Sequence, residues 1–452
     1  MILSNRRKVL KTALAAIASA TAATSAAALQ RQSNEGIEKA HTGAAPPALS
    51  NAEWHLVRRQ FALDEELVHM ACFLLSSHPK AVSMAINKYR SELDSNPAQF
   101  LMENDHELEL AVLQSAARYI NDVPENVALI RSTTEGLATL FNGISIGPGQ
   151  EVLTSTHDHY AMFRSLQFSA ERNGASIKRI GLYDQYNPTS ASADEIVNRI
   201  KNNITTKTRV VALTWVHSSS GIKLPIHEIA QVVAQANRGR SEKDRALLCV
   251  DGVHGFGVEN IDIQHMGCDF FIAGTHKWIF GPRGTGILWG KNDAWAHLEP
   301  TVPTFDFNAF LQWMKFLPES PIPGAIRMTP GGTHAYEHRW AMNQAFDFHI
   351  EIGKDRIADR VHSLNSQLKE GMANIKGVHL KTPIDSQLSS GITAFEIVGL
   401  GPQSGVKTFR AHNIIASQSP YAITYTRLTP GIINSEADVD YCLATAHKLA
   451  RA

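Results

Sequence analysis

The spacing of apolar residues changes along the chain near residue 127. Between Trp54 and Leu74 apolar side chains recur every three or four residues, which predicts a helical N-terminal segment. From about Val127 onwards, short apolar runs alternate with amphipathic stretches. The runs that we expect to form strands are Val127–Ile130, Glu151–Leu153, Ser176–Ile180, Arg209–Thr214, Leu247–Val250, Phe270–Ala273 and Gly286–Leu288. The helices expected between them include Tyr160–Arg172, Ala193–Asn202 and Ile226–Asn237. Strands that alternate with helices require crossover connections, so the pattern predicts a mainly parallel sheet.

The C-terminal third predicts a second, smaller domain. After a Pro-rich stretch at 318–330, two long helices are expected at Tyr336–Ile350 and Lys354–Ala373. The other expected elements are strands near Thr393–Val398 and Ala422–Thr426 and a last helix at Ala437–Leu449. We therefore predict an α/β fold with a large domain over 121–325. A smaller α+β domain would be built from 51–120 and 326–452.

The first 50 residues are predicted to form a targeting segment followed by a linker. The pair Arg6-Arg7 precedes a mildly apolar, Ala-rich run that ends in the small residues Ala26-Ala27-Ala28. The run is too short and too weakly apolar for stable membrane insertion. The order of these features resembles a twin-arginine (Tat) signal; an Ala-rich cytoplasmic tail is the alternative. We predict a signal peptide at 1–28, a linker at 29–50, passage through the Tat export machinery and a periplasmic location.

Composition and the spacing of the cysteines argue against several classes of protein. Lys+Arg and Asp+Glu each number 43, so there is no basic excess of the kind that nucleic-acid binding requires. The four cysteines lie far apart, without a CxxC pair or a Cys/His cluster, so neither a metal site nor a disulfide scaffold is expected. Cys249 lies in an apolar run and is expected to be a buried free thiol. Whether any of the cysteines pair stays open.

Two residues at expected strand ends carry the chemistry. Asp251 ends one apolar run, and Lys277 follows another and precedes a Gly-rich stretch. Strand ends of an open α/β sheet are where ligands bind. A partly desolvated lysine favours the neutral amine that a Schiff base requires. A carboxylate that keeps a pyridine nitrogen protonated completes the pairing that pyridoxal 5'-phosphate (PLP) needs.

The motifs around these residues resemble the class V aminotransferase family of PLP enzymes. Asp251-Gly252-Val253-His254 matches the strand-end D-x-x-[QH] of that family, and Thr275-His276-Lys277 with Gly281-Pro282 matches its H-K…G-P block. The resemblance covers nearly all of the chain after the signal. It implies a fold-type I PLP enzyme and a homodimer with its sites at the interface. It also implies that Lys277 is the residue linked to the cofactor.

The resemblance also implies contacts for the cofactor phosphate. Thr133 and Thr134 lie between a strand and a helix, where backbone N–H groups and hydroxyls can hold a phosphate. A plain helix cap is the alternative for either residue alone. His276 would reach the same phosphate. Thr333 resembles the threonine that reaches the neighbouring subunit's phosphate; the alternative there is a Gly-rich turn.

Four further residues are assigned by the same resemblance. His159 would stack on the pyridine ring, and His254 would hydrogen-bond the ring hydroxyl oxygen. Ser218 stands in the place of an asparagine near the same edge, so the sequence departs from the family at this contact. Arg427 would pair with the α-carboxylate of the substrate, because a guanidinium binds a carboxylate through two parallel hydrogen bonds; a solvated arginine at a strand end is the alternative.

One departure from the family argues against one of its reactions, the desulfuration of cysteine. Cysteine desulfurases need a nucleophilic cysteine shortly before that arginine, and the stretch 410–420 has none. Transamination, epimerisation and β-elimination at Cα remain, with Lys277 as the base. An export signal on isopenicillin N epimerase-like motifs resembles the periplasmic PLP enzymes of pyoverdine siderophore maturation, which implies a peptide-linked glutamate as substrate. A non-catalytic exported protein that keeps the fold is the alternative from another class.

Overall fold

The structure, a computed structural model, describes residues 47–319 and 324–451. The described residues from Leu49 onwards form one large compact unit. The signal predicted at 1–28 and most of the predicted linker lie outside the described residues. Among the described residues, no helix is long and apolar enough to cross a membrane.

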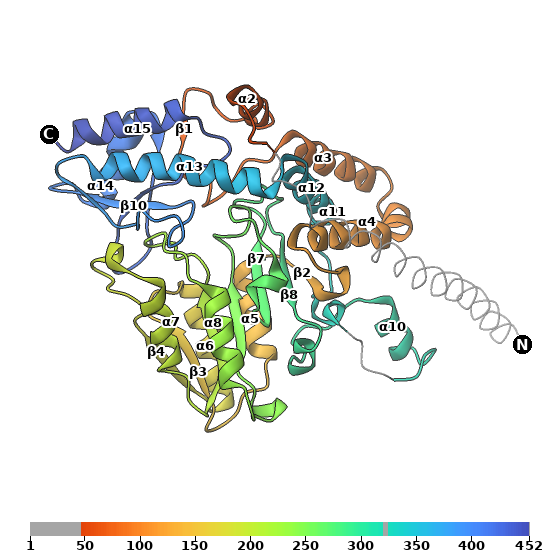
Figure 1. Ribbon diagram of the computed structural model, residues 1–452. Coiled ribbons are helices and arrows are strands. Elements are labelled where there is room, and N and C mark those ends of the chain that lie inside the picture. Colours follow the sequence, from red (N-terminus) through yellow and green to blue (C-terminus); the bar gives the residue numbers. More distant parts are fainter. Residues whose placement is uncertain (1–46, 320–323, 452) are drawn as a thin grey trace, which may run out of the picture. The chain divides into compact units, whose positions relative to one another are not determined.

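A seven-stranded sheet in the order β2-β8-β7-β6-β5-β3-β4 forms the centre of the large unit (Figure 1). Its strands are β2 (Val127–Ile130), β3 (Glu151–Ser155), β4 (Ser176–Ile180), β5 (Thr208–Thr214), β6 (Leu247–Asp251), β7 (Phe270–Gly274) and β8 (Gly286–Gly290). Strands β4, β3, β5, β6 and β7 run parallel, whereas β8 is antiparallel to both of its neighbours. The predicted α/β class with a mainly parallel sheet is confirmed.

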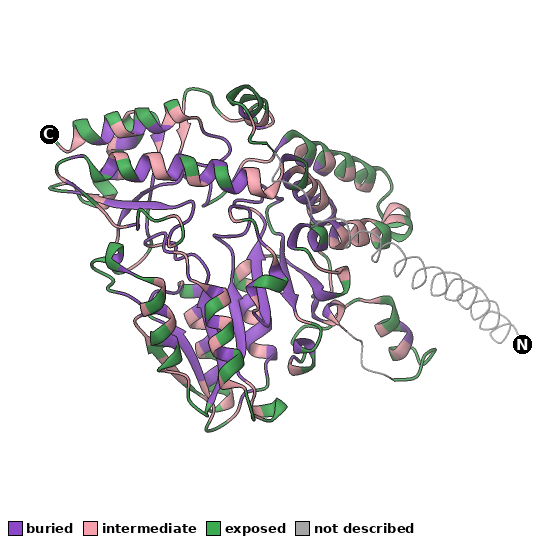
Figure 2. Cartoon of the chain, in the orientation of Figure 1, coloured by how far each residue is buried: buried purple, intermediate pink, exposed green. Residues whose placement is uncertain are grey.

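Alternate residues of the strands pack on opposite faces of this sheet. On β5, Val210 and Ala212 belong to the same buried cluster as the apolar residues of α5 (Thr133–Gly143) and α6 (Tyr160–Asn173). Val211 and Leu213 belong to the cluster that contains the apolar residues of α7 (Ala193–Lys201) and α8 (Ile226–Ala236). Because successive side chains of a strand point to opposite faces, a fully apolar strand must be covered on both sides. Figure 2 shows most of the sheet buried along its length.

A second, antiparallel sheet in the order β12-β13-β10-β9 is covered by two long helices. Its strands are β9 (Val378–Leu380), β10 (Thr393–Ile397), β12 (Ser417–Gln418) and β13 (Thr426–Leu428). The covering helices are α13 (Lys354–Ala373) and α15 (Glu436–Leu449), which run side by side in Figure 1. Helix α14 (Pro402–Ala411) and a short parallel pair, β1 (Val68–His69) with β11 (Ile414–Ile415), complete this part.

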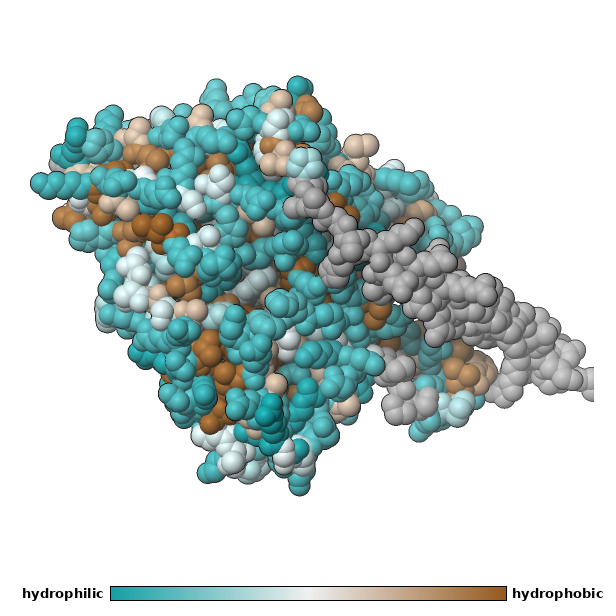
Figure 3. Space-filling model, viewed as in Figure 1, coloured by the Kyte–Doolittle hydropathy of each residue, from teal (hydrophilic) through white to brown (hydrophobic). Residues whose placement is uncertain are grey.

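Four helices pack together beside β2, the strand at one edge of the sheet. Helices α3 (Lys80–Ser95) and α4 (Pro97–Ile120) pack on α11 (Tyr336–Trp340) and α12 (Met342–Ile352). The remaining elements are α2 (Asn51–Arg58), α9 (Ile263–Met266), α10 (Phe307–Trp313), η1 (Pro124–Asn126), η2 (Pro188–Ser190), η3 (Glu242–Asp244), η4 (Ala294–His297) and η5 (Ala325–Met328). Around α10 large apolar side chains are exposed, and Figure 3 shows hydrophobic atoms gathered there.

All seven strands predicted for the large sheet are present, but three other predictions need correction. The predicted N-terminal helix is wrong beyond Arg58, because Met70 N–H donates to Ile415 O and the chain there is extended. Phe61, Met70 and Phe73 are buried by packing on other elements rather than by one helical face, and Leu74 is exposed. The helix predicted at Tyr336–Ile350 is interrupted at Ala341. The strand predicted at Ala422–Thr426 is wrong in position, since β13 begins at Thr426.

Candidate active site

The carboxyl ends of the parallel strands and the β2–α5 turn surround one cavity of about 270 Å³. Loops after β3, β5, β6 and β7 reach it from the large sheet, and Arg427 reaches it from β13. The residues that line it are Phe73, Leu74, Ser132, Thr133, Thr134, His159, Ala161, Thr214, Ser218, Asp251, Val253, His254, His276, Lys277, Pro420 and Arg427. Among the described residues, no group of three His, Cys, Asp or Glu side chains could hold a metal ion.

One end of the cavity is the N-terminus of α5. Ser132 caps this helix, because its Oγ accepts from Glu135 N–H at 3.1 Å. Thr133 and Thr134 form the first turn, where free backbone N–H groups and the helix dipole favour an anion. Thr133 Oγ1 accepts from Gly274 N–H at 2.8 Å, so its own hydroxyl proton stays available. A phosphate group fits this end of the cavity.

Lys277 and Asp251 face the cavity from adjacent strand ends. Burial lowers the pKa of the Lys277 amine to about 8, although the Asp251 charge opposes this shift. Burial raises the pKa of Asp251 to about 6, while Val253 N–H, 3.1 Å from Oδ1, and the Lys277 charge act in the opposite direction. Near pH 7 the lysine therefore has an accessible neutral form and the aspartate is largely ionised. Both forms suit PLP chemistry.

Three buried polar atoms around the cavity have no hydrogen-bond partner among the described residues: Thr214 Oγ1, His254 Nδ1 and Arg427 Nε. His254 Nε2 lies 3.2 Å from Lys277 Nζ. Buried polar groups in native proteins almost always have partners, so unpaired atoms lining a cavity indicate a polar ligand. The ring substituents, the phosphate and an amino-acid carboxylate supply such partners, so the residues present fit PLP together with a substrate.

His159 is fixed at the start of α6 by its own cap and by a buried carboxylate. Its Nδ1 accepts from Ala161 N–H at 3.2 Å. The neighbouring Asp158 accepts from Ser155 Oγ at 2.7 Å and from Thr214 N–H at 2.8 Å, which ties the β3 loop to β5. Burial lowers the pKa of His159, and the charges of Lys277 and Arg427 add to the shift. A neutral imidazole held in this way can lie flat against an aromatic ring.

Arg427 forms the wall of the cavity opposite the large sheet. Its side chain is buried, with Nη1 donating to Ser218 O and Nη2 donating to Gln418 O at 2.7 Å. The guanidinium carbon lies 4.6 Å from the centre of the Phe73 ring. Because the two carbonyls take only two of five N–H groups, donors remain for a carboxylate.

Nine of the ten residues singled out from the sequence therefore surround one cavity. The exception is Thr333, which is exposed and does not line it. Sequence reasoning missed Thr214, Phe73 and Tyr421; the last bonds Ser218 Oγ through its hydroxyl at 2.6 Å. Thr214 ends an expected strand just as Asp251 does, so that position could have found it. The roles assigned to individual residues stay predictions.

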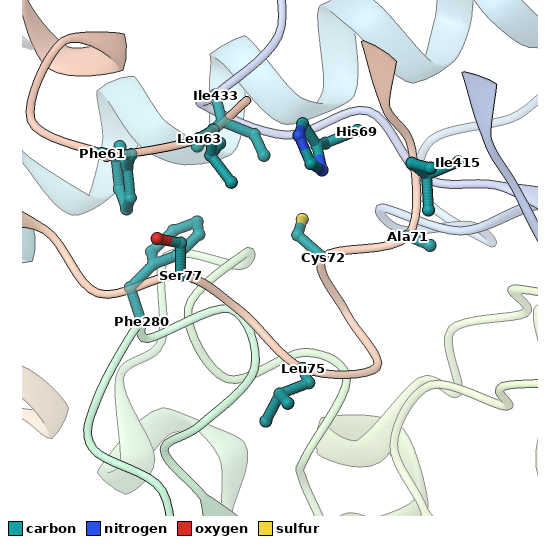
Figure 4. Close-up of a pocket in the computed structure, with 10 residues that line it drawn as sticks. All are labelled: Phe61, Leu63, His69, Ala71, Cys72, Leu75, Ser77, Phe280, Ile415 and Ile433. Carbon is teal, nitrogen blue, oxygen red and sulfur yellow. The ribbon is translucent and has the colours of Figure 1, made fainter. Parts of the chain in front are cut away.

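None of the four cysteines lines this cavity. All four are buried and free, and burial raises each thiol pKa, that of Cys72 to about 12. Cys72 instead lines a separate, largely apolar cavity of about 90 Å³ with Phe61, Phe280 and Ile433 (Figure 4). A buried, protonated thiol is a poor nucleophile. The expectation that Cys249 is a buried free thiol is confirmed.

Comparison with known proteins identifies the family. The profile "Aminotransferase class-V" matches residues 76–420, which is most of the chain. The chain belongs to the class V aminotransferase family. It is therefore a PLP-dependent enzyme, as the resemblance implied.

The relatives of this chain are named for more than one activity. The chain is 24% identical to isopenicillin N epimerase of Streptomyces clavuligerus over 405 residues, covering 86% of this chain and 96% of that protein. It is 25% identical to a probable cysteine desulfurase of Halalkalibacterium halodurans over 376 residues, covering 80% and 86%. Among solved structures, a variant of C-DES with glycine linked to its PLP cofactor matches with TM-score 0.77 and 21% identity, covering 86% of this chain and 98% of that chain. The apo cysteine desulfurase of Thermococcus onnurineus NA1 gives 0.75 and 18%, covering 90% and 100%. These structures share the fold.

Proposed function

We propose that this class V enzyme performs PLP-dependent chemistry at the Cα of an amino acid or a peptide-linked amino acid. The observation that carries the proposal is the meeting of Lys277, Asp251 and Arg427 at one cavity that no cysteine lines. When bound, PLP supplies the aldehyde that captures an amino group and the ring that takes up electron density from Cα.

The role of each side chain follows from its position in the cavity. Arg427 binds the substrate carboxylate and so orients the Cα–H bond. Lys277 Nζ removes that proton in its neutral form and returns it. The Asp251 carboxylate holds a proton on the ring nitrogen. Asp158 and His159 set the position of the ring, and the first turn of α5 holds the phosphate.

For the outcome and the substrate, we propose transamination-type modification of a peptide-linked glutamate. The place would be the periplasm, during pyoverdine siderophore maturation. The export signal expected at 1–28 and the missing desulfurase cysteine support this proposal. A glutamate attached through one carboxyl still offers an amino group and a free carboxylate, the groups that Lys277 and Arg427 require.

Epimerisation is a second candidate, favoured by the likeness to isopenicillin N epimerase over 96% of that protein. Elimination by a C–S lyase uses the same lysine and is a third. The outcomes differ in where the proton returns and whether a bond at Cβ breaks.

The test incubates the pure holoenzyme with glutamyl peptides in D₂O. Transamination gives a keto product and a loss of the yellow absorbance of the bound cofactor. Epimerisation instead gives deuterium at Cα with inverted configuration. Release of alanine and sulfur from cysteine at a comparable rate would overturn the proposed reaction. A deletion strain that releases siderophore of unchanged mass would refute the substrate, while Lys277→Ala serves as the inactive control in every assay.

A further inference from the structure

The loop between β12 and β13 is closed at its base and holds Tyr421 against Ser218, which lines the active-site cavity. Ser419 N–H donates to Tyr425 O at 3.0 Å, and Tyr425 N–H donates to Ser419 Oγ at 2.8 Å. The Tyr425 hydroxyl donates to Gln185 O at 2.9 Å, which ties the loop to the segment that follows β4. The loop is therefore fixed on both sides of Tyr421.

Tyr421 and Arg427 meet at the same residue. The Tyr421 hydroxyl lies 2.6 Å from Ser218 Oγ, and Arg427 Nη1 donates to the backbone oxygen of Ser218. The Tyr421 ring stands edge-on to His159, with ring centres 6.2 Å apart and planes at 80°. A phenol, a serine hydroxyl and a guanidinium thus lie together beside the residue expected to contact the ring.

A simple count of protons shows what this pair of hydroxyls can do. Tyr421 and Ser218 carry one hydroxyl proton each, and the bond between them uses one. Whichever hydroxyl donates, the other keeps a proton for a further hydrogen bond. Burial raises the pKa of Tyr421 to about 12, although the bond to Ser218 and the Arg427 charge oppose this, so the phenol stays protonated at neutral pH.

The neighbouring guanidinium indicates the kind of acceptor. Arg427 is buried, and its Nε has no hydrogen-bond partner among the described residues. A buried cation with unused donors favours an anion, and a carboxylate has two oxygens with about four acceptor positions. One group can therefore bond Arg427 and still accept from the hydroxyl pair.

We propose that the Tyr421–Ser218 pair forms, with Arg427, a subsite for the substrate carboxylate, in which Ser218 donates its proton to the Tyr421 oxygen and Tyr421 donates its own proton to the carboxylate. Tyr421 is thus a substrate-binding residue beyond those assigned above. The inference rests on the proposed function in one respect only, namely that the substrate carries a carboxylate.

The test measures binding without reaction. Glutarate has two carboxylates and no amino group, so its binding to the holoenzyme by isothermal titration calorimetry is independent of any turnover. We expect Tyr421→Phe to weaken glutarate binding about tenfold or more, since a hydrogen bond to a charged group is lost. Tyr425→Phe is the matched control, because it removes a hydroxyl from the same loop that bonds Gln185 O rather than Ser218. The two hydrogen bonds between Ser419 and Tyr425 that close the base of the loop stay in this variant, so it should bind glutarate as the wild type does.

Other results would contradict the subsite or the proposed reaction. Unchanged glutarate affinity in Tyr421→Phe, or no binding of glutarate to the wild type, overturns the subsite. An equal loss in Tyr425→Phe assigns the effect to the loop and overturns it too. A shifted pH midpoint of the cofactor absorbance in Tyr421→Phe, with glutarate affinity unchanged, would place the hydroxyl on the cofactor's ring oxygen instead. A functioning subsite on an enzyme that fails to transaminate glutamyl peptides would refute only the proposed reaction.

Discussion

The ionisation of Lys277 should be measurable in the cofactor-free chain. Burial lowers the pKa of this amine from 10.5 to about 8. Since each pKa unit is a factor of ten, about 10% of the amine is neutral at pH 7, compared with about 0.03% at an ordinary pKa, a gain of about 300-fold. Only the neutral amine is a nucleophile, so the reactivity of Lys277 should rise with pH up to about 8 and then level off.

Competitive labelling follows this ionisation directly. The cofactor-free protein and a reference lysine peptide of ordinary pKa are treated with acetic anhydride between pH 6 and 11, and acetylation of each lysine is read by peptide mass spectrometry. The ratio of Lys277 to the reference removes the pH dependence of the reagent. Asp251→Asn should move the Lys277 midpoint down, because the carboxylate raises that pKa.

Two results would refute this reasoning. A Lys277 profile that keeps rising in step with the reference lysine beyond pH 10 would mean that the amine is not desolvated. A midpoint that moves up in Asp251→Asn would mean that the two side chains do not interact as their charges require.

Three other predictions concern packing and assembly. Gly257→Ala should lower the free energy of unfolding in urea by about 2–4 kcal/mol, because a Cβ there would lie 2.6 Å from the backbone of the residue after Lys277 and φ is 97°. Gly239→Ala is the control; φ is 79° there but the Cβ meets open space, so it should cost only about 1 kcal/mol. Equal losses in the two variants would contradict the packing argument. Burial alone would raise the pKa of Glu259, but its hydrogen bond with His362 and the charge of Lys223 lower it to about 2. A folded pKa below the unfolded value stabilises above about pH 4.5, and this stability is lost as pH falls towards 2. Glu259→Gln should therefore cost about 3 kcal/mol at pH 7 and less at pH 3, and a loss independent of pH would contradict this assignment. The active enzyme should be a homodimer by light scattering, as the exposed apolar side chains near α10 favour, and a fully active monomer would refute it.

The sequence predicted the large sheet well because its strands are short, are mostly buried on both faces and are separated by amphipathic helices. Asp251 and Lys277 could be placed for the same reason, since Asp251 ends an otherwise apolar strand and Lys277 follows another shortly after its end. The contact between Ser218 and Tyr421 could not be predicted, because 203 residues separate them and no spacing rule says which loop reaches across. Phe73 was misassigned to a helix, since apolar residues buried by several partners can mimic a helical period.

The positions of the four free thiols allow local unfolding of the protein to be measured region by region. Cys72 and Cys268 lie in the apolar cluster that includes α7 and α8, Cys249 in the cluster under α5 and α6, and Cys442 in the cluster under α13 and α15. A thiol reagent can modify each of them only after its own cluster opens. Timed alkylation followed by peptide mapping would therefore rank the regions by how easily they open, without any introduced label. The same measurement, made with and without PLP, would show how far ligand binding at the cavity slows opening elsewhere in the chain.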